Sequence, residues 1–323
     1  MTTVSNTHSL NNAIPFGTPK LWLKTTAAKL WLLFSLFLAH ALSAGSVYAF
    51  DGDIEWNGWT LSYTTETLTG LELHDVSFNG RKILNRANFP VMRVEYDNDV
   101  CGPFADILLE QNYVPIAVDP PNDTCNGDGL CARSYDQGDN RFLELGVNAK
   151  LGEYEIYQSF VFSADGYFDS YVFSRGLQCD ANHRHHAHWM FDFDIDGKED
   201  DQVLKNSGDL QSSEFNDRRE NTSYWTIQDA ETGLRVEVIP GENDGFPDQF
   251  AQWDVAARRY NSGETGLWRW GARGDIGSLF NDAENIDRQD IVFWYISHLD
   301  HKAVEGSQLW HASGPRVRVI EPQ

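Results

Sequence analysis

Residues 182–197 read NHRHHAHWMFDFDIDG and bring two kinds of metal ligand into one stretch. Four histidines fall within six residues, and three aspartates follow at alternate positions. In an extended strand, side chains two residues apart lie on the same face, so His183 and His185 can reach one metal ion. Asp192 and Asp194 share a face in the same way and offer oxygen ligands to a harder cation. The stretch therefore predicts two chemically different metal sites, although a solvated loop would have the same pattern.

The remainder of the chain predicts an all-β fold. Short segments rich in β-branched and aromatic residues recur, and turn signals such as Asn79-Gly80 separate them. Only residues 248–260 could form a short helix, and the polar residues 198–222 predict a long surface loop. We therefore expect one large antiparallel β-sandwich over residues 50–323. Its strands are expected at 59–63, 71–78, 91–96, 142–147, 155–162, 167–173, 235–239, 291–297 and 317–320.

The composition supports a sizeable core and argues against two classes of partner. The chain has 323 residues, of which 41% are hydrophobic, and this is ample for a single large domain. Its formal net charge is −23. With no basic stripe to neutralise phosphates, neither nucleic acid nor an anionic membrane is an expected partner. The charge favours a cationic substrate.

The first 49 residues have the organisation of a targeting segment. Lys20, Lys24 and Lys29 form a positive region, and residues 30–42 form an apolar run that is short for a membrane span. Small residues then reach Ala49, where we expect cleavage. The prediction is a signal peptide over residues 1–49, with an uncleaved N-terminal anchor as the alternative. In both cases the folded part is exported to the periplasm or secreted.

Export agrees with the four cysteines, because disulfides persist outside the cytosol. Four cysteines allow three pairings, and the sequence alone does not choose among them. Cys125 and Cys131 flank the turn sequence Asn-Gly-Asp-Gly, which would allow a local bond. A bond between Cys101 and Cys179 would then tie two distant strands.

Several blocks of the chain resemble the catalytic domain of copper amine oxidases, in the order in which that family has them. Residues 70–84, GLELHDVSFNGRKIL, followed by the strand 91–96, resemble the hairpin and strand that open that domain. Residues 152–166 are similar to the strand that carries the cofactor tyrosine. The remaining blocks are the His-x-His with its following Asp and Asp-Gly in 183–197, the hairpin 226–241, and the strand that leads from 287 to 301. The resemblance implies a reduced form of the family's large β-sandwich.

The resemblance implies a copper ion and a quinone. His183, His185 and His301 match the three copper ligands, and imidazole nitrogens suit Cu(II). Tyr154 matches the tyrosine that copper and O₂ convert into topaquinone. His186 or His188 could replace one of the ligands if the register of this strand shifts.

Two further residues take catalytic roles from the resemblance. Asp106 looks like the catalytic base, and Tyr96 matches the tyrosine that hydrogen-bonds the quinone oxygen. Fewer residues separate these two than in the family, so Asp97, Asp99 and Asp119 are rivals for the base. A base in this role needs a fixed position and a raised pKa.

The sequence departs from the family next to the cofactor. Glu153 stands where the family has an asparagine before the cofactor tyrosine, so this position beside the quinone is a carboxylate. Farther along, hard oxygen ligands fall where some members hold structural Ca²⁺. These implied ligands are the side chains of Asp192, Asp194 and Asp290 and the carbonyls of Phe193 and Ile291.

These roles predict oxidative deamination of a small primary amine by O₂, giving an aldehyde, H₂O₂ and ammonia, in a protein that forms a homodimer. The alternative is a non-catalytic descendant that keeps copper, or only the sandwich, for binding or structure. Tyr154 and the three histidines favour the enzyme, whereas Glu153 and the shortened segment between 106 and 154 favour the alternative. An unrelated carbohydrate-binding sandwich would leave the ordered blocks unexplained.

Overall fold

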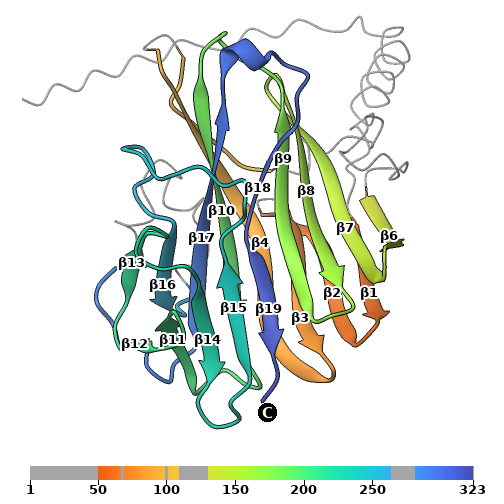
Figure 1. Ribbon diagram of the computed structural model, residues 1–323, viewed down its shortest axis with the longest axis vertical. Coiled ribbons are helices and arrows are strands. Elements are labelled where there is room, and N and C mark those ends of the chain that lie inside the picture. Colours follow the sequence, from red (N-terminus) through yellow and green to blue (C-terminus); the bar gives the residue numbers. More distant parts are fainter. Residues whose placement is uncertain (1–49, 67–68, 99–100, 109–129, 263–280, 323) are drawn as a thin grey trace, which may run out of the picture. The chain divides into compact units, whose positions relative to one another are not determined.

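The computed structural model describes residues 50–66, 69–98, 101–108, 130–262 and 281–322, which lie within a compact unit spanning Val47–Gln323. The described chain is almost entirely strand and forms two antiparallel sheets packed face to face (Figure 1). The predicted β-sandwich is therefore confirmed. Across the described ranges, no helix is long and apolar enough to cross a membrane. The predicted targeting segment, residues 1–49, lies outside these ranges.

The first sheet carries the histidine-rich strand at its centre. Its strand order is β1-β2-β3-β4-β10-β17-β16-β13, and β5 pairs with β4. The strand bounds are β1 Asp51–Trp56, β2 Trp59–Glu66, β3 Gly70–Phe78, β4 Arg81–Tyr96, β5 Phe104–Asp106, β10 His183–Phe193, β13 Phe215–Asp217, β16 Val255–Arg259 and β17 Ile291–His301.

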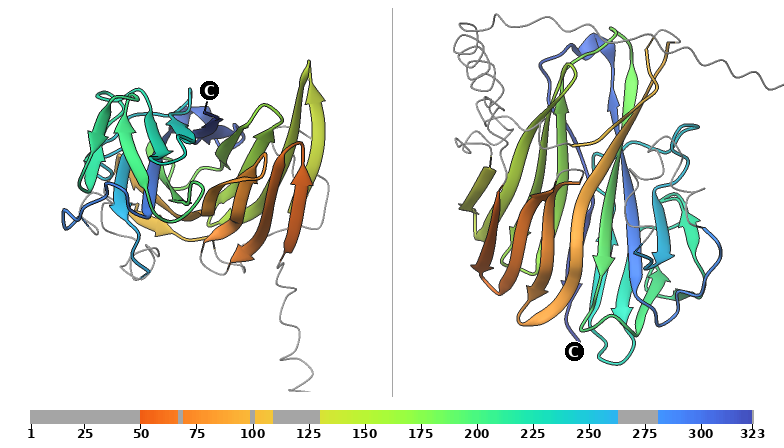
Figure 2. Two further views of the ribbon diagram at one scale, coloured as in Figure 1. Left: turned by 90° about the horizontal axis from the view of Figure 1, so that it is seen from below. Right: turned by 180° about the vertical axis from the view of Figure 1, so that it is seen from behind.

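The second sheet covers the core face of the first. Its order is β12-β11-β14-β15-β19-β9-β8-β7-β6, and β18 pairs with β9. Its strands lie in front in Figure 1, and those of the first sheet lie in front when the molecule is seen from behind (Figure 2, right). The bounds are β6 Leu130–Gln137, β7 Asn140–Leu151, β8 Tyr154–Ser163, β9 Tyr167–Arg175, β11 Asp201–Lys205, β12 Asp209–Gln211, β14 Trp225–Asp229, β15 Arg235–Ile239, β18 His311–Ser313 and β19 Arg316–Ile320.

Alternation along β10 sends its side chains to two different environments. Ala187, Trp189 and Phe191 point into the main core between the sheets, whereas Met190 belongs to a smaller cluster on the opposite face. Trp189 packs against Phe89 of its own sheet and Phe160 of the other, with ring centroids 5.0 and 5.6 Å away. The same alternation places His183 and His185 on the core face, above this aromatic layer.

Two local predictions were wrong. Residues 248–260 form no helix, because Val255 and Ala257 face the main core while Ala256 faces the outer cluster, which is the period of a strand. The region 198–222 is not a continuous loop, since it contains β11, β12 and β13. β12 and β13 end their sheets, where few hydrophobic side chains are needed.

The disulfide that would join two distant strands is present. Cys101, which follows β4, is bonded to Cys179, which precedes β10. Cys131 is also disulfide-bonded, and Cys125 lies outside the described residues.

Candidate active site

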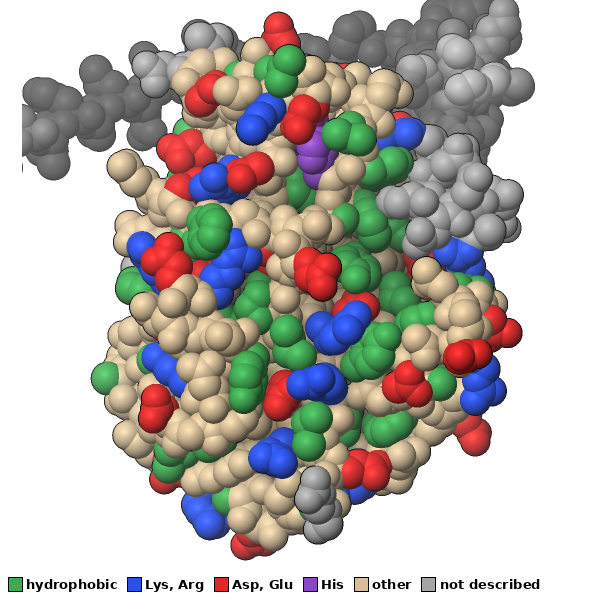
Figure 3. Space-filling model, in the orientation of Figure 1, with side chains coloured by type: hydrophobic (Ala, Val, Ile, Leu, Met, Phe, Trp, Pro, Cys, Tyr) green, Lys and Arg blue, Asp and Glu red, His purple; other side chains and the backbone are tan. Residues whose placement is uncertain are grey.

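Three histidines meet on the core face of the first sheet, at the end that is uppermost in Figure 1. His183 begins β10 and lies directly opposite His301, the last residue of β17. The ring of His183 lies between those of His185 and His301, with centroids 4.8 and 4.7 Å away. All three side chains are buried, and histidine occupies little of the face in Figure 3. Strand register thus brings together the three residues that the sequence proposed as copper ligands.

The nitrogens of these histidines have different partners. His183 Nδ1 lies 2.9 Å from the carbonyl of Ala181, and His301 Nε2 lies 2.9 Å from the carbonyl of Gly306. Nδ1 of His185 is buried without a hydrogen-bond partner. Burial lowers the pKa of His183 to about 4 and that of His185 well below its usual value, so both rings are neutral at pH 7. Neutral imidazoles with an unsatisfied buried nitrogen fit a metal ion.

Tyr154 reaches this group from the opposite sheet. A two-residue turn pairs Leu151 with Tyr154 and makes Tyr154 the first residue of β8. Its hydroxyl lies 3.0 Å from the hydroxyl of Tyr96 and 3.1 Å from Nε2 of His183. It also accepts a hydrogen bond of 3.2 Å from the backbone N–H of Gln178. The phenol of Tyr154 therefore lies where the two sheets, the histidines and a loop converge.

Two loops close over the tyrosines. Gly176 has a φ of 132°, and a Cβ there would lie 2.4 Å from the carbonyl oxygen of Glu153 and 2.8 Å from Cα of Tyr154. Gly102 has a φ of 72°, and a Cβ there would lie 2.9 Å from the ring of Tyr96. Glycine alone allows both approaches. Because Cys101 precedes Gly102 and Cys179 follows Gln178, the disulfide joins the two loops.

A hollow of about 490 Å³ opens beside His183 and His301. Its wall carries more acidic than basic side chains, because only Arg184 and Lys302 oppose four carboxylates. Arg184 is itself paired with Asp300 and lies 3.3 Å from Asp248. The hollow thus presents negative charge to a ligand. Its lining residues are Glu95, Tyr96, Asp97, Asn182, His183, Arg184, Asp248, Asp300, His301 and Lys302.

Residues 50–102 match the family model described as copper amine oxidase, enzyme domain. No curated protein sequence matches the chain. Among solved structures, a copper-containing benzylamine oxidase from Hansenula polymorpha superposes with a TM-score of 0.66 at 16% identity, over 83% of this chain and 59% of that one. The chain is therefore similar to the copper amine oxidase enzyme domain in sequence over residues 50–102 and in fold over 83% of its length.

Two other solved structures have a similar fold. The amine oxidase of Aspergillus nidulans has a TM-score of 0.66 at 14% identity, and the Pichia pastoris lysyl oxidase has 0.62 at 12%. Each alignment covers 83% of this chain and 51% of the other. The chain thus spans between half and three-fifths of the length of these three oxidases. At these identities the structural likeness establishes the fold.

Asp106, the expected base of a copper amine oxidase, lies on the same face as Tyr96. It ends β5 opposite Met92 of β4, and paired residues of antiparallel strands share a face. Asp106 is half-buried, and burial raises its pKa. Burial is also the largest cause of the raised pKa values of Tyr96 and Tyr154, to which the charge of Asp106 adds. Its rival Asp97 is exposed and accepts a hydrogen bond of 2.6 Å from Asn182.

The sequence also named two further candidates for the base and placed Glu153 beside the quinone. Asp99 and Asp119, the remaining rivals for the base, lie outside the described residues. Glu153 occupies the turn between β7 and β8, where its side chain is exposed and forms none of the contacts around the Tyr154 hydroxyl. Its backbone carbonyl faces Gly176 instead.

The expected calcium ligands lie at the other end of β10 and β17. Phe193 is paired with Ile291, which places Asp192, Asp194 and Asp290 beside this pair. Burial, with the charges of Asp192 and Asp194, raises the pKa of Asp290 to about 7. Lys82 partly neutralises the negative charge of these aspartates, because its Nζ lies 2.7 Å from the carboxylate of Asp194.

The sequence missed three residues near these sites. Asp201 is fully buried beside the acidic cluster, and burial raises its pKa to about 9. It follows Glu199 and Asp200, so the sequence alone resembles an exposed acidic run. Gln178 binds the Tyr154 hydroxyl through its backbone N–H, which any residue except proline would supply, so its residue type gives no signal. His311 lies ten residues after His301 in the sequence, yet the two rings are only 4.3 Å apart.

Proposed function

We propose that this chain is an exported oxidase of primary amines that uses copper and a quinone derived from Tyr154. The observation that carries the proposal is the position of the Tyr154 hydroxyl, 3.1 Å from His183 and 3.0 Å from Tyr96. A tyrosine that becomes a cofactor must lie next to the metal and yet be held by a partner. This arrangement meets both needs, and the likeness to copper amine oxidases supports it.

The residues fit the metal and the cofactor. His183, His185 and His301 would hold Cu(II), because all three side chains are buried at one place and imidazole nitrogens suit this ion. The lowered pKa values of His183 and His185 leave these two rings neutral, as coordination requires. With Cu(II) held by these histidines, Tyr154 would be the residue that O₂ oxidises to topaquinone, and the quinone would supply two-electron transfer from the amine to O₂. Tyr96 would fix the orientation of the ring through its hydroxyl, and the loop at Gln178 would keep bulk water away.

The surrounding charges suit an amine substrate. The acidic side chains around the hollow would attract the ammonium group. The carboxylate of Asp106 would take a proton from the carbon next to the amine nitrogen, because its raised pKa makes it a better base than an exposed aspartate. We also propose that Asp192, Asp194 and Asp290, with the carbonyls of Phe193 and Ile291, hold Ca²⁺. On the resemblance alone we propose a homodimer, which sedimentation would test.

A second function, copper binding without catalysis, is favoured by Glu153. The family has an asparagine at this position, whereas here the side chain is a carboxylate in an exposed turn. If quinone formation requires the asparagine side chain that the family has at this position, copper would bind and Tyr154 would stay unmodified.

One experiment separates the two functions. Purified protein is given Cu(II) in air, and its visible spectrum is recorded before and after phenylhydrazine, which labels quinones. The oxidase predicts a quinone band and a coloured adduct that are both absent from Tyr154→Phe. Stoichiometric copper without any chromophore would reject the oxidase and leave the binding protein.

A further inference from the structure

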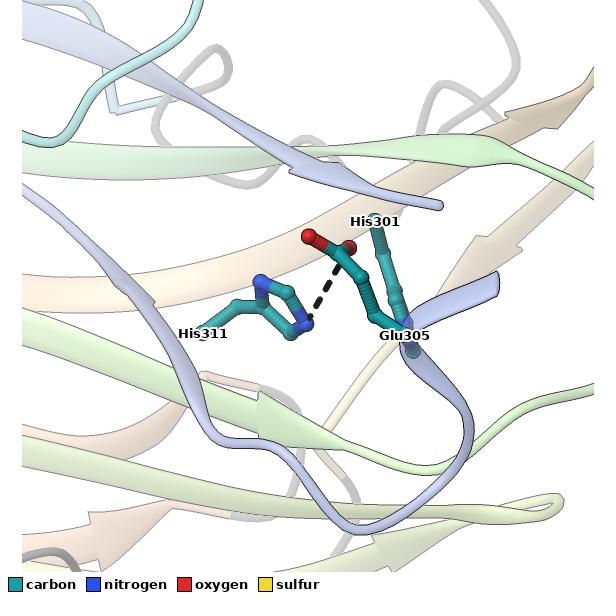
Figure 4. A group of neighbouring side chains, drawn as sticks. All are labelled: His301, Glu305 and His311. Carbon is teal, nitrogen blue, oxygen red and sulfur yellow. Dashed lines mark ion pairs between the residues drawn. The ribbon is translucent and has the colours of Figure 1, made fainter. Parts of the chain in front are cut away.

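A second group of side chains of the types that can bind a metal ion includes His301 and the loop that follows it. The chain leaves β17, forms the short helix η4 (Ala303–Glu305), and enters the second sheet as β18, which begins at His311. His301, Glu305 and His311 thus come from three successive elements of one crossing between the sheets. Figure 4 shows their side chains turned toward one another.

The ligand atoms of these residues converge. One nitrogen from each histidine and one carboxylate oxygen of Glu305 all lie within 4.8 Å of one another. Nε2 of His311 is buried without a hydrogen-bond partner, and it lies 3.8 Å from Oε2 of Glu305. That distance is too long for a hydrogen bond. It suits two atoms bound to one ion, since zinc–ligand bonds are about 2.0–2.2 Å long.

The backbone holds the carboxylate in place. The N–H of Lys302 donates a hydrogen bond of 2.8 Å to Oε2 of Glu305, and Gly306 ends the turn with a φ of 73°. The N–H of Ala303 donates to the side-chain oxygen of Asn182, 3.0 Å away, which anchors the helix beside β10. Nε2 of His301 faces the carbonyl of Gly306 within the same loop. The three ligands are therefore arranged by local structure.

We propose that His301, Glu305 and His311 bind a divalent transition metal, with Zn²⁺ as the ion that fits two imidazoles and one carboxylate. Three protein ligands leave a fourth position for water. The site shares His301 with the proposed copper ligands, so occupation of one site withdraws a ligand from the other. Only this sharing rests on the proposed function, because the ligand set stands without it. Zinc bound here would therefore slow copper loading at His183 and His185.

Zinc titration of the full chain, freed of metal, tests the site. His185→Ala removes a copper ligand and leaves the loop intact, so this variant should bind one zinc ion per chain. Adding Glu305→Gln or His311→Ala should weaken its zinc affinity by at least about tenfold. His74→Ala, at a half-buried histidine paired with Glu72 elsewhere in the sheet, is the matched control and should change nothing. Circular dichroism verifies folding, and His311→Asn serves if the alanine variant does not fold.

The outcomes separate this inference from the oxidase proposal. If His185→Ala binds no zinc, or if Glu305→Gln and His311→Asn bind as tightly as their parent, the loop site is refuted whatever the spectrum shows. If zinc binds as expected and no quinone forms with copper, the oxidase fails and the loop site stands. Sharing is tested by loading zinc first. Bound zinc should delay the appearance of the copper signal in electron paramagnetic resonance of the wild type, but not of His311→Ala. An equal delay in both proteins would refute the sharing of His301.

Discussion

The hydroxyls of Tyr96 and Tyr154 lie 3.0 Å apart, although the two residues belong to opposite sheets. Tyr96 ends β4 and is paired with His183, so its position is fixed by the same register that places the histidines. Tyr154 begins β8 and enters the group from the other side. The contact therefore forms only when both sheets are correctly packed at this end of the sandwich.

Tyr96→Phe should impair the orientation of the cofactor more than the fold. Tyr154 would keep its contacts with His183 and Gln178, so the loss in unfolding free energy should be about 1 kcal/mol. We expect the quinone to form and amine turnover to fall, measured as H₂O₂ release per quinone. Tyr63→Phe, a tyrosine of β2 away from the site, is the control. Unchanged turnover in Tyr96→Phe would show that this hydrogen bond has no catalytic role.

Local patterns predicted the strands that carry the site. The alternation that places His183 and His185 on one face is a property of the extended backbone, so the sequence sufficed. Their meeting with His301 depends on the register between β10 and β17, which the residues alone do not specify. The family resemblance supplied that pairing. It also supplied Tyr154, whose neighbourhood depends on how the second sheet covers the first.

The errors have a common physical cause. β11 to β13 carry many polar residues because they lie at or near sheet edges, and polarity alone resembled a loop. Residues 255–259 contain alanines and arginines, which suit a helix, but pairing with β17 overrides that preference. His311 is ten residues from His301 in sequence, and only the path of the crossing brings the two rings together.

Asp106→Asn should abolish turnover while leaving cofactor formation intact. The carboxylate is proposed to accept a proton during amine oxidation, and its loss should lower kcat by about 10²- to 10⁴-fold. Copper content and the quinone band should stay as in the wild type, since among the described residues Asp106 has no hydrogen bond or ion pair with His183, His185 or His301. Asp97→Asn, at the exposed rival, should reduce kcat far less. The reverse ranking of the two variants would move the base to Asp97.

Removing the disulfide should loosen the loops over both tyrosines. Cys101 and Cys179 are 78 residues apart in sequence, and a closed loop of that length stabilises the fold by on the order of 4 kcal/mol. The double variant Cys101→Ser/Cys179→Ser should therefore unfold at lower denaturant concentration and exchange the amide hydrogen of Gln178 faster. Hydrogen exchange at strands far from the loops, such as β14, serves as an internal control. Equal protection of the Gln178 amide from hydrogen exchange in both proteins would show that the disulfide does not hold this loop in place.

Asp201 should make stability fall as pH rises. Its pKa is raised to about 9 in the folded state, so the folded protein holds a proton that the unfolded chain releases near pH 4. The stabilising contribution is complete below the unfolded pKa and is lost as pH rises toward 9, at up to about 1.4 kcal/mol per pH unit. Urea unfolding between pH 5 and 9 should show a shallower decline for Asp201→Asn. Exposed Asp209→Asn is the control, and identical slopes for all three proteins would refute burial of a protonated Asp201.

Gly176→Ala tests how closely the second loop must approach Tyr154. The control is Gly138→Ala, because Gly138 also has a positive φ, of 64°, but a Cβ there would meet no atom within 4 Å. Gly138→Ala should cost about 1 kcal/mol from backbone conformation alone. Gly176→Ala adds a clash with the backbone of Glu153 and Tyr154, which no rotamer can relieve, so its cost should exceed that of the control by at least about 1 kcal/mol. The loop must then move away, the N–H of Gln178 loses its contact with the Tyr154 hydroxyl, and quinone formation should slow in this variant alone. Equal unfolding free energies and equal rates of quinone formation in the two variants would show that the loop does not need its observed position for Tyr154 to react.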